Sequence, residues 1–198
     1  MLLGDVADVK TGLVLSRKKA EIKYDAKATY KLITLKNITE NGVVIKDSFE
    51  EFVSNDSLEE HYFTKEGDVL MRLNYPHTAV FIEKQYSGLL VPSYFAIIKV
   101  DQTKFLPEYV ACYLNSNAVK KELERSHAGS RIPSTNQNVI KMLPVVQTTL
   151  SKQKALVELN RLHQKEIELY QLLMGEKKKW FNAVSDKIIH GDIKEENK

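Results

Sequence analysis

The chain has 198 residues, of which 43% are hydrophobic, and its formal net charge is +3 at neutral pH. This is enough apolar material for the core of one ordinary domain, and no run approaches the roughly 18 to 20 apolar residues of a membrane-spanning helix. The single cysteine, Cys112, excludes an internal disulfide and any zinc site with several cysteine ligands. The N-terminus, MLLGDVADVK, has acids where a signal peptide would have bases, so we expect a cytoplasmic protein.

Charge is distributed unevenly along the chain. Residues 10–36 hold eight Lys or Arg against two acids, whereas residues 37–68 hold nine acids against two Lys. The chain from residue 69 to residue 150 is basic again. The sequence therefore predicts a polarised surface rather than a uniformly basic protein, although a plain solvated face explains the first segment equally well when it is taken alone.

Residues 1–148 have the pattern of an α+β domain with a twisted, mostly antiparallel sheet. Short runs rich in β-branched and aromatic residues, bounded by Gly, Pro or Asn, predict strands at 30–38, 42–53, 68–73, 78–83, 88–100 and 142–146. Asn41-Gly42, between the first two runs, predicts a hairpin. Apolar residues at helical spacing after Pro107 predict a helix over 107–127.

Residues 149–198 form a second region, dominated by one predicted helix. Between residues 150 and 190 there is no proline and a single glycine, Gly175, and Thr149 or Ser151 can cap the start. A straight helix of about 40 residues is on the order of 60 Å long, so its apolar stripe needs a partner helix or another protein. In the alternative, Gly175 and the run Lys177–Lys179 divide the segment into two helices that fold back on each other. The stripe includes Leu156, Leu159, Leu162, Leu169, Tyr170, Leu173 and Trp180.

The sequence contains no convincing catalytic or metal site, and we expect neither enzyme activity nor a cofactor. The stretch Asn74–His77 has a superficial likeness to the motif that holds a flipped adenine in amino-methyltransferases, but no glycine-rich loop for a methyl donor accompanies it. We interpret it as a turn between strands. Cys112 is interpreted as a small core residue. The histidines lack the close spacing of metal ligands; they are His61, His77, His127, His163 and His190.

DNA binding is better supported, because polar and aromatic residues recur at the predicted strand ends and in the predicted loops. Arg can read guanine bidentately, Asn can read adenine, and Lys, Ser and backbone amides bind phosphates. Each position is commonplace alone, and together they predict a DNA-binding face. The residues are Arg17, Lys18, Lys19, Lys36, Asn37, Arg72, Asn74, Tyr75, His77, Ser93, Tyr94, Ser130 and Arg131.

The order of these features resembles one half of the DNA-specificity (S) subunit of type I restriction-modification systems. The resemblance covers essentially the whole chain and rests on the order and spacing of its pieces, none of which is specific alone. The pieces are LLGDVADVKTG, LITLKNITENGVV, EGDVLMR, YVACYLNSN, GSRIPSTNQNVIKMLPVV and QKALVELNRLHQKEIE. The chain departs from the family pattern after Arg72, and at Pro144 and Lys152 before the long helix. It also has one recognition domain and one helix, where full-length subunits have two of each.

The resemblance implies a fold, partners and roles for particular residues. Residues 1–148 would be a target-recognition domain that binds double-stranded DNA, with Gly129, Ser130 and Arg131 in a loop that faces it. Residues 149–198 would form an intermolecular antiparallel coiled coil in a homodimer or with a different half-subunit, and would set the gap between two half-sites. The helices would dock methyltransferase (modification) subunits, and the motor/restriction subunit would bind through that complex. S-adenosylmethionine and ATP would belong to those partners.

Three other interpretations remain open at this stage. The chain can be the recognition piece of a fused restriction-methylation enzyme. Its independent Met start and the tail GDIKEENK argue only mildly against this interpretation. It can be a stand-alone coiled-coil regulator that binds DNA without a methyltransferase, although no helix-turn-helix pattern is visible. It can also be an inactive fragment left by recombination within a specificity locus.

Overall fold

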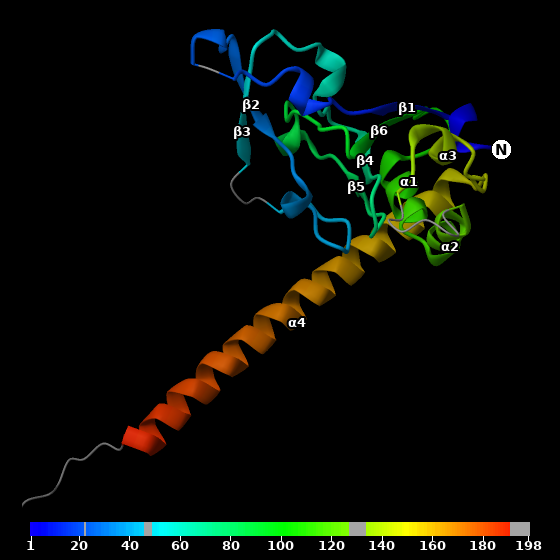
Figure 1. The fold of residues 1–198 in the computed structure, drawn as a ribbon. Coiled ribbons are helices and arrows are strands. Elements are labelled where there is room, and N and C mark those ends of the chain that lie inside the picture. The colour runs from blue at the N-terminus through cyan, green and yellow to red at the C-terminus, as the bar shows by residue number, and fades with distance from the viewer. Residues whose placement is uncertain (22, 46–48, 127–133, 191–198) are drawn as a thin grey trace, which may run out of the picture. The chain divides into compact units, whose positions relative to one another are not determined.

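The computed structural model describes residues 1–21, 23–45, 49–126 and 134–190 (Figure 1). The chain forms two compact units, Met1–Val157 and Glu158–Lys198. The division falls inside the long helix α4 (Leu150–His190), so the first turns of this helix belong to the unit that contains the sheets.

A four-stranded antiparallel sheet forms the centre of the first unit. Its strand order is β1 (Ala7–Thr11), β6 (Phe95–Val100), β4 (Asp68–Arg72) and β5 (Ala79–Phe81). The central strands β4 and β6 carry consecutive apolar residues and are buried over most of their length, because both faces of the sheet are covered. The predicted α+β class with antiparallel pairing is confirmed.

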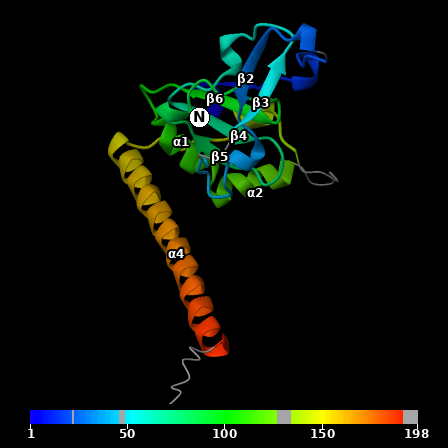
Figure 2. The ribbon, with the colours of Figure 1, turned by 90° about the vertical axis from the view of Figure 1, so that its left-hand side faces the viewer.

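A separate two-stranded sheet pairs β2 (Ala28–Leu32) with β3 (Glu50–Ser54), and the two strands lie side by side in Figure 2. These strands are shorter than the predicted runs 30–38 and 42–53. The difference arises because Leu35–Asn37 forms a 3-10 turn, closed by the Asn37 side chain. The hairpin at Asn41-Gly42 is present as a single antiparallel bridge between Ile38 and Val44, and Gly42 has a φ of 74° there.

Two further predicted strands need correction, and one strand was not predicted. The run 88–100 is a regular strand only from Phe95, because Pro92 has no N–H for a strand ladder. The run 142–146 forms only a bridge between Pro144 and Leu2, for the same reason. The structure also contains β1, whose exposed charged residues Asp8 and Lys10 alternate with buried Val9 and disguise its apolar face.

The helical pattern over 107–127 divides into α1 (Pro107–Leu114) and α2 (Asn117–Ser126), which corrects the prediction of one helix. Asn115 lies between them. Its side-chain amide accepts a hydrogen bond from the N–H of Ala79 at 2.9 Å and donates one to the carbonyl of the same residue at 2.7 Å. The amide thus satisfies the backbone of edge strand β5 and ties the end of α1 to the sheet. A short helix, α3 (Gln137–Lys141), is capped by the side chain of Asn136.

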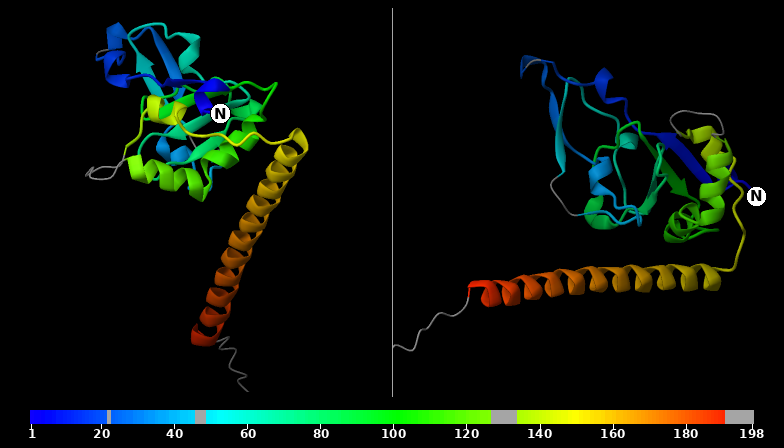
Figure 3. Two further views of the ribbon diagram at one scale, coloured as in Figure 1. Left: turned by 90° about the vertical axis from the view of Figure 1, so that its right-hand side faces the viewer. Right: turned by 60° about the horizontal axis from the view of Figure 1, so that its bottom comes forward.

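The core lies on both faces of the four-stranded sheet. Helices α1, α2 and α3 gather on one side of this sheet, and the β2–β3 pair lies away from them (Figures 1 and 3). Because side chains alternate along a strand, Val69 and Met71 of β4 pack toward the helices, while Leu70 packs into a second cluster on the other face. Cys112 is partly buried on α1, and burial and the nearby Glu108 raise the pKa of its thiol.

The long helix α4 is continuous for 41 residues and passes through Gly175 without interruption. The alternative of two helices that fold back at Gly175 is therefore wrong. A helix of this length measures about 60 Å. None of the helices in the described parts of the chain combines the length and the hydropathy needed to cross a membrane.

Gln153 attaches the beginning of α4 to the sheet-containing unit. Its side chain is 1% exposed. The Oε1 atom accepts a hydrogen bond from the N–H of Leu106 at 2.8 Å, and Nε2 donates to the carbonyls of Lys104 at 3.0 Å and Thr148 at 3.2 Å. One turn later, Val157 packs against the core cluster that includes α1.

Replacing Gly175 with alanine should stabilise α4. A glycine inside a helix costs about 0.5–1 kcal/mol relative to alanine, and a Cβ at this position would meet no atom within 4 Å. We expect Gly175→Ala to raise the midpoint of thermal unfolding measured by far-ultraviolet circular dichroism. Ala183→Gly, at another exposed position of the same helix, should lower it; changes of the same sign in both variants would contradict this account.

Candidate nucleic-acid interface

Four strand ends meet at one end of the four-stranded sheet. Thr11 pairs with Ala96, Arg72 with Phe95, and Met71 with Ala79. Because all neighbours are antiparallel, the chain leaves β1 and β4 at the same end at which it enters β5 and β6. The connecting segments that start or finish there are Gly12–Lys19, Leu73–Thr78 and Pro92–Tyr94.

Backbone hydrogen bonds join these segments into one surface. The N–H of Leu13 donates to the carbonyl of Val91 at 2.8 Å, and the N–H of Leu73 donates to the carbonyl of Tyr94 at 3.0 Å. The segment that follows residue 133 joins them, since Ser134 bridges to Asn74 and the N–H of Thr135 donates to the carbonyl of Leu73 at 2.7 Å. We call this set the sheet-end surface; it comprises Gly12–Lys19, Leu73–Thr78, Pro92–Tyr94 and Ser134–Thr135.

Several predicted DNA-binding residues are exposed on or beside this surface. Arg17 and Lys19 are exposed at the turn η2 (Leu15–Arg17) and just after it, and Asn74 and Tyr75 are exposed in the turn after β4. Tyr75 is 65% exposed. Its ring and that of His77 form a T-shaped pair with a centroid distance of 6.4 Å. An exposed aromatic ring next to an amide side chain, with exposed cations on another loop of the same surface, is a combination that nucleic-acid surfaces use for stacking and phosphate contact.

Two of the predicted cations already have acidic partners. The Lys18 ammonium lies 2.7 Å from a carboxylate oxygen of Asp56, and this hydrogen bond raises the pKa of Lys18 and lowers that of Asp56. The Lys36 ammonium lies 3.6 Å from Glu50, with its side chain largely in solvent. Exposed pairs of this kind are weak, so both lysines can exchange their partners for phosphate at little cost.

Two predicted contacts, Asn37 and His77, are buried and so are not placed to contact DNA, and a third, Arg72, is partly buried with its side chain bound to backbone carbonyls. Asn37 is buried, and its Oδ1 accepts hydrogen bonds from the N–H and the hydroxyl of Thr34. His77 is buried in the turn before β5, with Nδ1 3.3 Å from the carbonyl of Arg72. The Arg72 guanidinium donates to the carbonyls of Leu35 and Ile38. These groups serve the fold of the loops.

The remaining predicted residues are divided between the surface and the part of the chain that is not described. Ser93 and Tyr94 are half-buried at the entry to β6, and burial, with a smaller effect of Glu50, raises the pKa of Tyr94 to about 12. Tyr94 therefore keeps its phenolic proton and can donate it in a hydrogen bond. Gly129, Ser130 and Arg131 lie outside the described residues.

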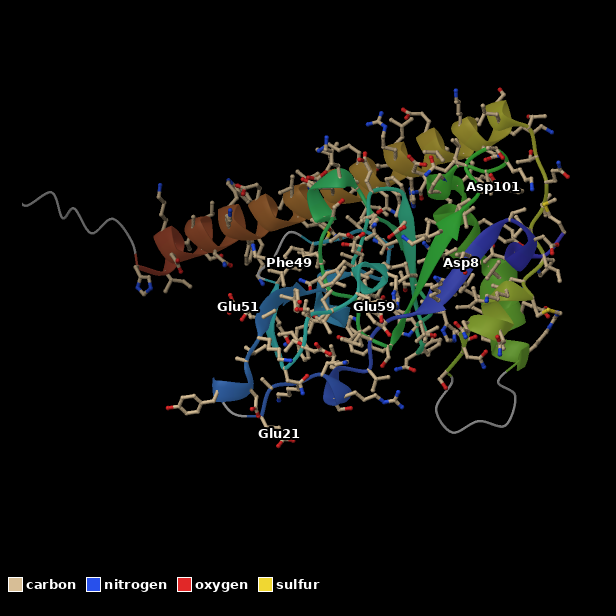
Figure 4. The ribbon with its side chains drawn as sticks, turned by 90° about the horizontal axis from the view of Figure 1, so that it is seen from above. Asp8, Glu21, Phe49, Glu51, Glu59 and Asp101 are labelled. Carbon is tan, nitrogen blue, oxygen red and sulfur yellow. The ribbon has the colours of Figure 1, made fainter. Side chains whose placement is uncertain are left out.

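The opposite end of the sheet carries acids that were not predicted to form a group. Asp68 begins β4, Glu83 follows β5 and Asp101 follows β6. Figure 4 shows Asp101 and Asp8 in this part of the unit. Asp68 is buried and neutralised by Lys99 at 2.7 Å, and Asp101 accepts from Thr103. The sequence has an acidic residue next to each of these strand ends. That the acids gather at one end of the sheet follows only from the strand order.

Helix α4 presents the residues predicted to contact a partner helix. Every one of them, from Leu156 to Trp180, is exposed in the single chain, and so are further large apolar residues of the same helix. Ion pairs with i, i+3 spacing, such as Arg161–Glu158 and Lys165–Glu168, lie on the same helix. The additional apolar residues are Leu172, Met174, Phe181, Ile188 and Ile189.

Nothing in the described parts of the chain forms a cluster of His, Cys, Asp or Glu suited to a metal ion. The stretch Asn74–His77 is the turn between β4 and β5, with a cis peptide bond between Tyr75 and Pro76.

Comparison with known proteins identifies the fold. No protein-family model matches the sequence, and no curated protein matches it. Among solved structures, the HsdS subunit from Thermoanaerobacter tengcongensis matches with a TM-score of 0.68 at 15% identity, over 93% of this chain and 46% of that one. The type I restriction-modification S subunit from M. genitalium matches with a TM-score of 0.57 at 11% identity, over 98% and 46%.

A third match is a chain of the type I R-M system, solved in work on its complex assembly and conformational transition. Its TM-score is 0.64 at 16% identity, over 90% of this chain and 45% of that one. The chain thus spans about half the length of each structure that it matches. It has the fold of one half of a type I specificity subunit, as the resemblance predicted.

Proposed function

We propose that this chain is the DNA-specificity subunit of a type I restriction-modification system in a half-length form. Residues 1–148 would recognise DNA, and residues 149–198 would join the subunit to its partners. The shared fold with type I specificity subunits over at least 90% of the chain is the observation that carries this proposal. The subunit would act in the cytoplasm without catalysing a reaction, because methyl transfer and ATP-driven motion would belong to the methyltransferase and motor subunits.

The sheet-end surface is the part that would face DNA. Arg17, Lys19 and Lys36 would bind phosphates, while Asn74 and Tyr75 have side chains suited to base edges and faces. Gly129, Ser130 and Arg131 precede Ser134 in the chain, and Ser134 bridges to Asn74 on this surface. We therefore retain these three residues as proposed contacts.

Helix α4 would pair antiparallel with the same helix of a second copy. With Tyr170 near the two-fold axis, Leu156 faces Val184 and Leu159 faces Phe181, so apolar residues meet along the pair. A homodimer of this form would place one recognition domain at each end and would bind two identical, inverted half-sites with a fixed gap. Methyltransferase subunits would dock along the paired helices.

One experiment tests this function directly. The chain is expressed with the methyltransferase subunit encoded next to it in the genome, and methylated adenines are mapped on the host DNA. We expect a new methylated sequence in the form of an interrupted palindrome. A methylated sequence with two different halves would instead indicate a second, different half-subunit, and no new methylation would refute the proposal. Tight sequence-specific binding by the chain alone, without any methylation, would favour the stand-alone regulator.

Removing cations from the sheet-end surface should weaken binding in a salt-dependent way. A side chain that neutralises one phosphate adds about 1 to the slope of log affinity against log salt, so Arg17→Ala and Lys19→Ala should each reduce this slope by that amount for any duplex sequence. The measurement is a salt titration of duplex binding by fluorescence anisotropy. Lys84→Ala is the matched control, because Lys84 is exposed after β5 at the opposite end of the sheet; an equal effect there would argue against this surface.

A further inference from the structure

Arg72 is the last residue of β4, and its guanidinium is directed at backbone carbonyls of a distant segment. One terminal nitrogen donates to the carbonyl of Ile38 at 3.1 Å and also to the carbonyl of Leu35. These acceptors are 34 and 37 residues away in the sequence. The Nε atom is buried and has no hydrogen-bond partner among the described residues. Burial lowers the pKa of Arg72, and Glu40 partly opposes this, so the group remains a cation enclosed by the loop.

The segment that Arg72 binds, Leu35–Ile45, is folded on itself. The N–H of Ile45 donates to the carbonyl of Asn37 at 2.7 Å, and the N–H of Thr39 donates to the carbonyl of Val43 at 2.9 Å. The two carbonyls that accept from Arg72 therefore flank the residue at which the segment closes. Arg72 fixes the base of this hairpin segment to the end of β4.

The tip of the same segment is packed against β5. A Cβ on Gly42 would lie 2.6 Å from the carbonyl oxygen of Ala79 and 2.8 Å from the Asn115 amide nitrogen. Asn115 and Ala79 are themselves joined by two hydrogen bonds. The hairpin segment is thus held at its base by Arg72 and at its tip by a close approach that only glycine allows.

The backbone of Arg72, in turn, is hydrogen-bonded within the sheet-end surface. Its N–H donates to the carbonyl of Thr78 at 2.9 Å, which closes the turn that presents Asn74 and Tyr75. Its carbonyl lies 3.3 Å from Nδ1 of His77 within the same turn. Arg72 therefore has its main chain in the turn after β4 and its side chain in the hairpin segment.

We propose that Arg72 is a positioning residue for DNA recognition, which holds the turn bearing Asn74 and Tyr75 and the hairpin segment bearing Lys36 in one fixed arrangement. This inference rests on the proposed function of the chain. It differs from the expectation that Arg72 binds DNA itself, because the terminal nitrogen that donates both hydrogen bonds is already committed to the carbonyls of Leu35 and Ile38. Replacing Arg72 would then loosen the arrangement that selects bases and leave the number of bound phosphates unchanged.

The test uses the full chain in complex with its methyltransferase subunit, with Arg72→Lys as the principal variant. Lysine keeps the positive charge, but its side chain is shorter and lacks the planar guanidinium, so its ammonium cannot take the place of the terminal nitrogen that binds both carbonyls. The DNA probes are a duplex of random sequence and a duplex selected by the wild-type complex. We expect the affinity for the random duplex to stay within about twofold and the salt slope to stay unchanged, while the preference for the selected duplex falls at least about tenfold.

Gly42→Ala is the second variant, because it disturbs the tip of the same segment without changing any charge. It should reproduce the loss of preference with the salt slope intact. Arg17→Ala is the matched control and should show the reverse, a lower slope with the preference retained. If Arg72→Lys instead weakens both duplexes equally, so that the preference is retained, the positioning role is wrong.

Amide hydrogen exchange of the DNA-free chain separates this inference from the proposed function. Arg72→Lys should speed exchange at least about tenfold at the N–H groups of Thr39 and Ile45, whereas Arg17→Ala should leave them unchanged. Unchanged exchange in Arg72→Lys would overturn the positioning role even if DNA binding is abolished. Faster exchange in a complex that binds no DNA would leave the structural role of Arg72 intact and refute the function proposed for the chain.

Discussion

Replacing both Leu159 and Leu173 with glutamate should convert a dimer of this chain into a monomer. Both side chains are more than half exposed in the single chain and lie two heptads apart on the proposed contact face of α4. Burying a leucine contributes about 1.5–3 kcal/mol, so four leucines in a symmetric pair contribute on the order of 6 kcal/mol or more. The dimer dissociation constant should rise at least about 10⁴-fold.

Analytical ultracentrifugation of the wild-type chain and the double variant would measure this change. Gln171→Glu combined with Asn182→Glu is the matched control, since it adds the same charge to exposed polar positions of the same helix. The control should keep the dimer within about tenfold. A wild-type chain that is monomeric at high concentration would refute the paired helix, and equal dissociation of both double variants would show that charge alone acts, without an apolar contact face.

Gly12→Ala should strongly destabilise the unit that contains the sheets. A Cβ on Gly12 would lie 2.4 Å from the carbonyl oxygens of both Val91 and Pro92, which are backbone atoms that cannot rotate away. The chain is held there by hydrogen bonds from Gly12 to Phe95 and from Ser93 to Leu13. The backbones would have to separate, at a cost of about 3 kcal/mol or more in the free energy of unfolding.

Urea unfolding followed by circular dichroism would report this destabilisation, whereas tryptophan fluorescence would not, because the single tryptophan, Trp180, lies outside the affected unit. Gly88→Ala is the control: Gly88 has a positive φ, of 85°, but a Cβ there would meet no atom within 4 Å. It should cost only about 1–2 kcal/mol for the left-handed conformation. If both variants are destabilised equally, the close crossing at Gly12 is not what determines the effect.

The sequence was sufficient to predict the fold class and the long helix, because these depend on patterns within a continuous segment. The apolar run within Asp68–Arg72 predicts a buried strand, and the absence of proline between residues 150 and 190 allows one continuous helix. Strand ends were less predictable. Pro92 and Pro144 each interrupt a run of suitable residues, and β1 carries too many charges to stand out.

The sequence indicated which polar residues follow the strands, but not the direction of their side chains. Polar residues after strands indicated a surface at the sheet end, where Asn74 and Tyr75 are indeed exposed. Arg72 and Asn37 have the same residue types as DNA contacts but bind the backbone instead. The partners of Arg72 are more than 30 residues away in sequence, so the choice between solvent and interior depends on tertiary structure that no local pattern contains.

The attachment of α4 through Gln153 also bears on how much the sequence beside the helix can vary. All three groups that bind the Gln153 amide belong to the main chain, at Lys104, Leu106 and Thr148. Side chains at these positions can therefore vary without loss of a hydrogen bond. A sheet-containing unit of different sequence could thus be joined to the same helix, provided that the backbone path beside the helix is kept.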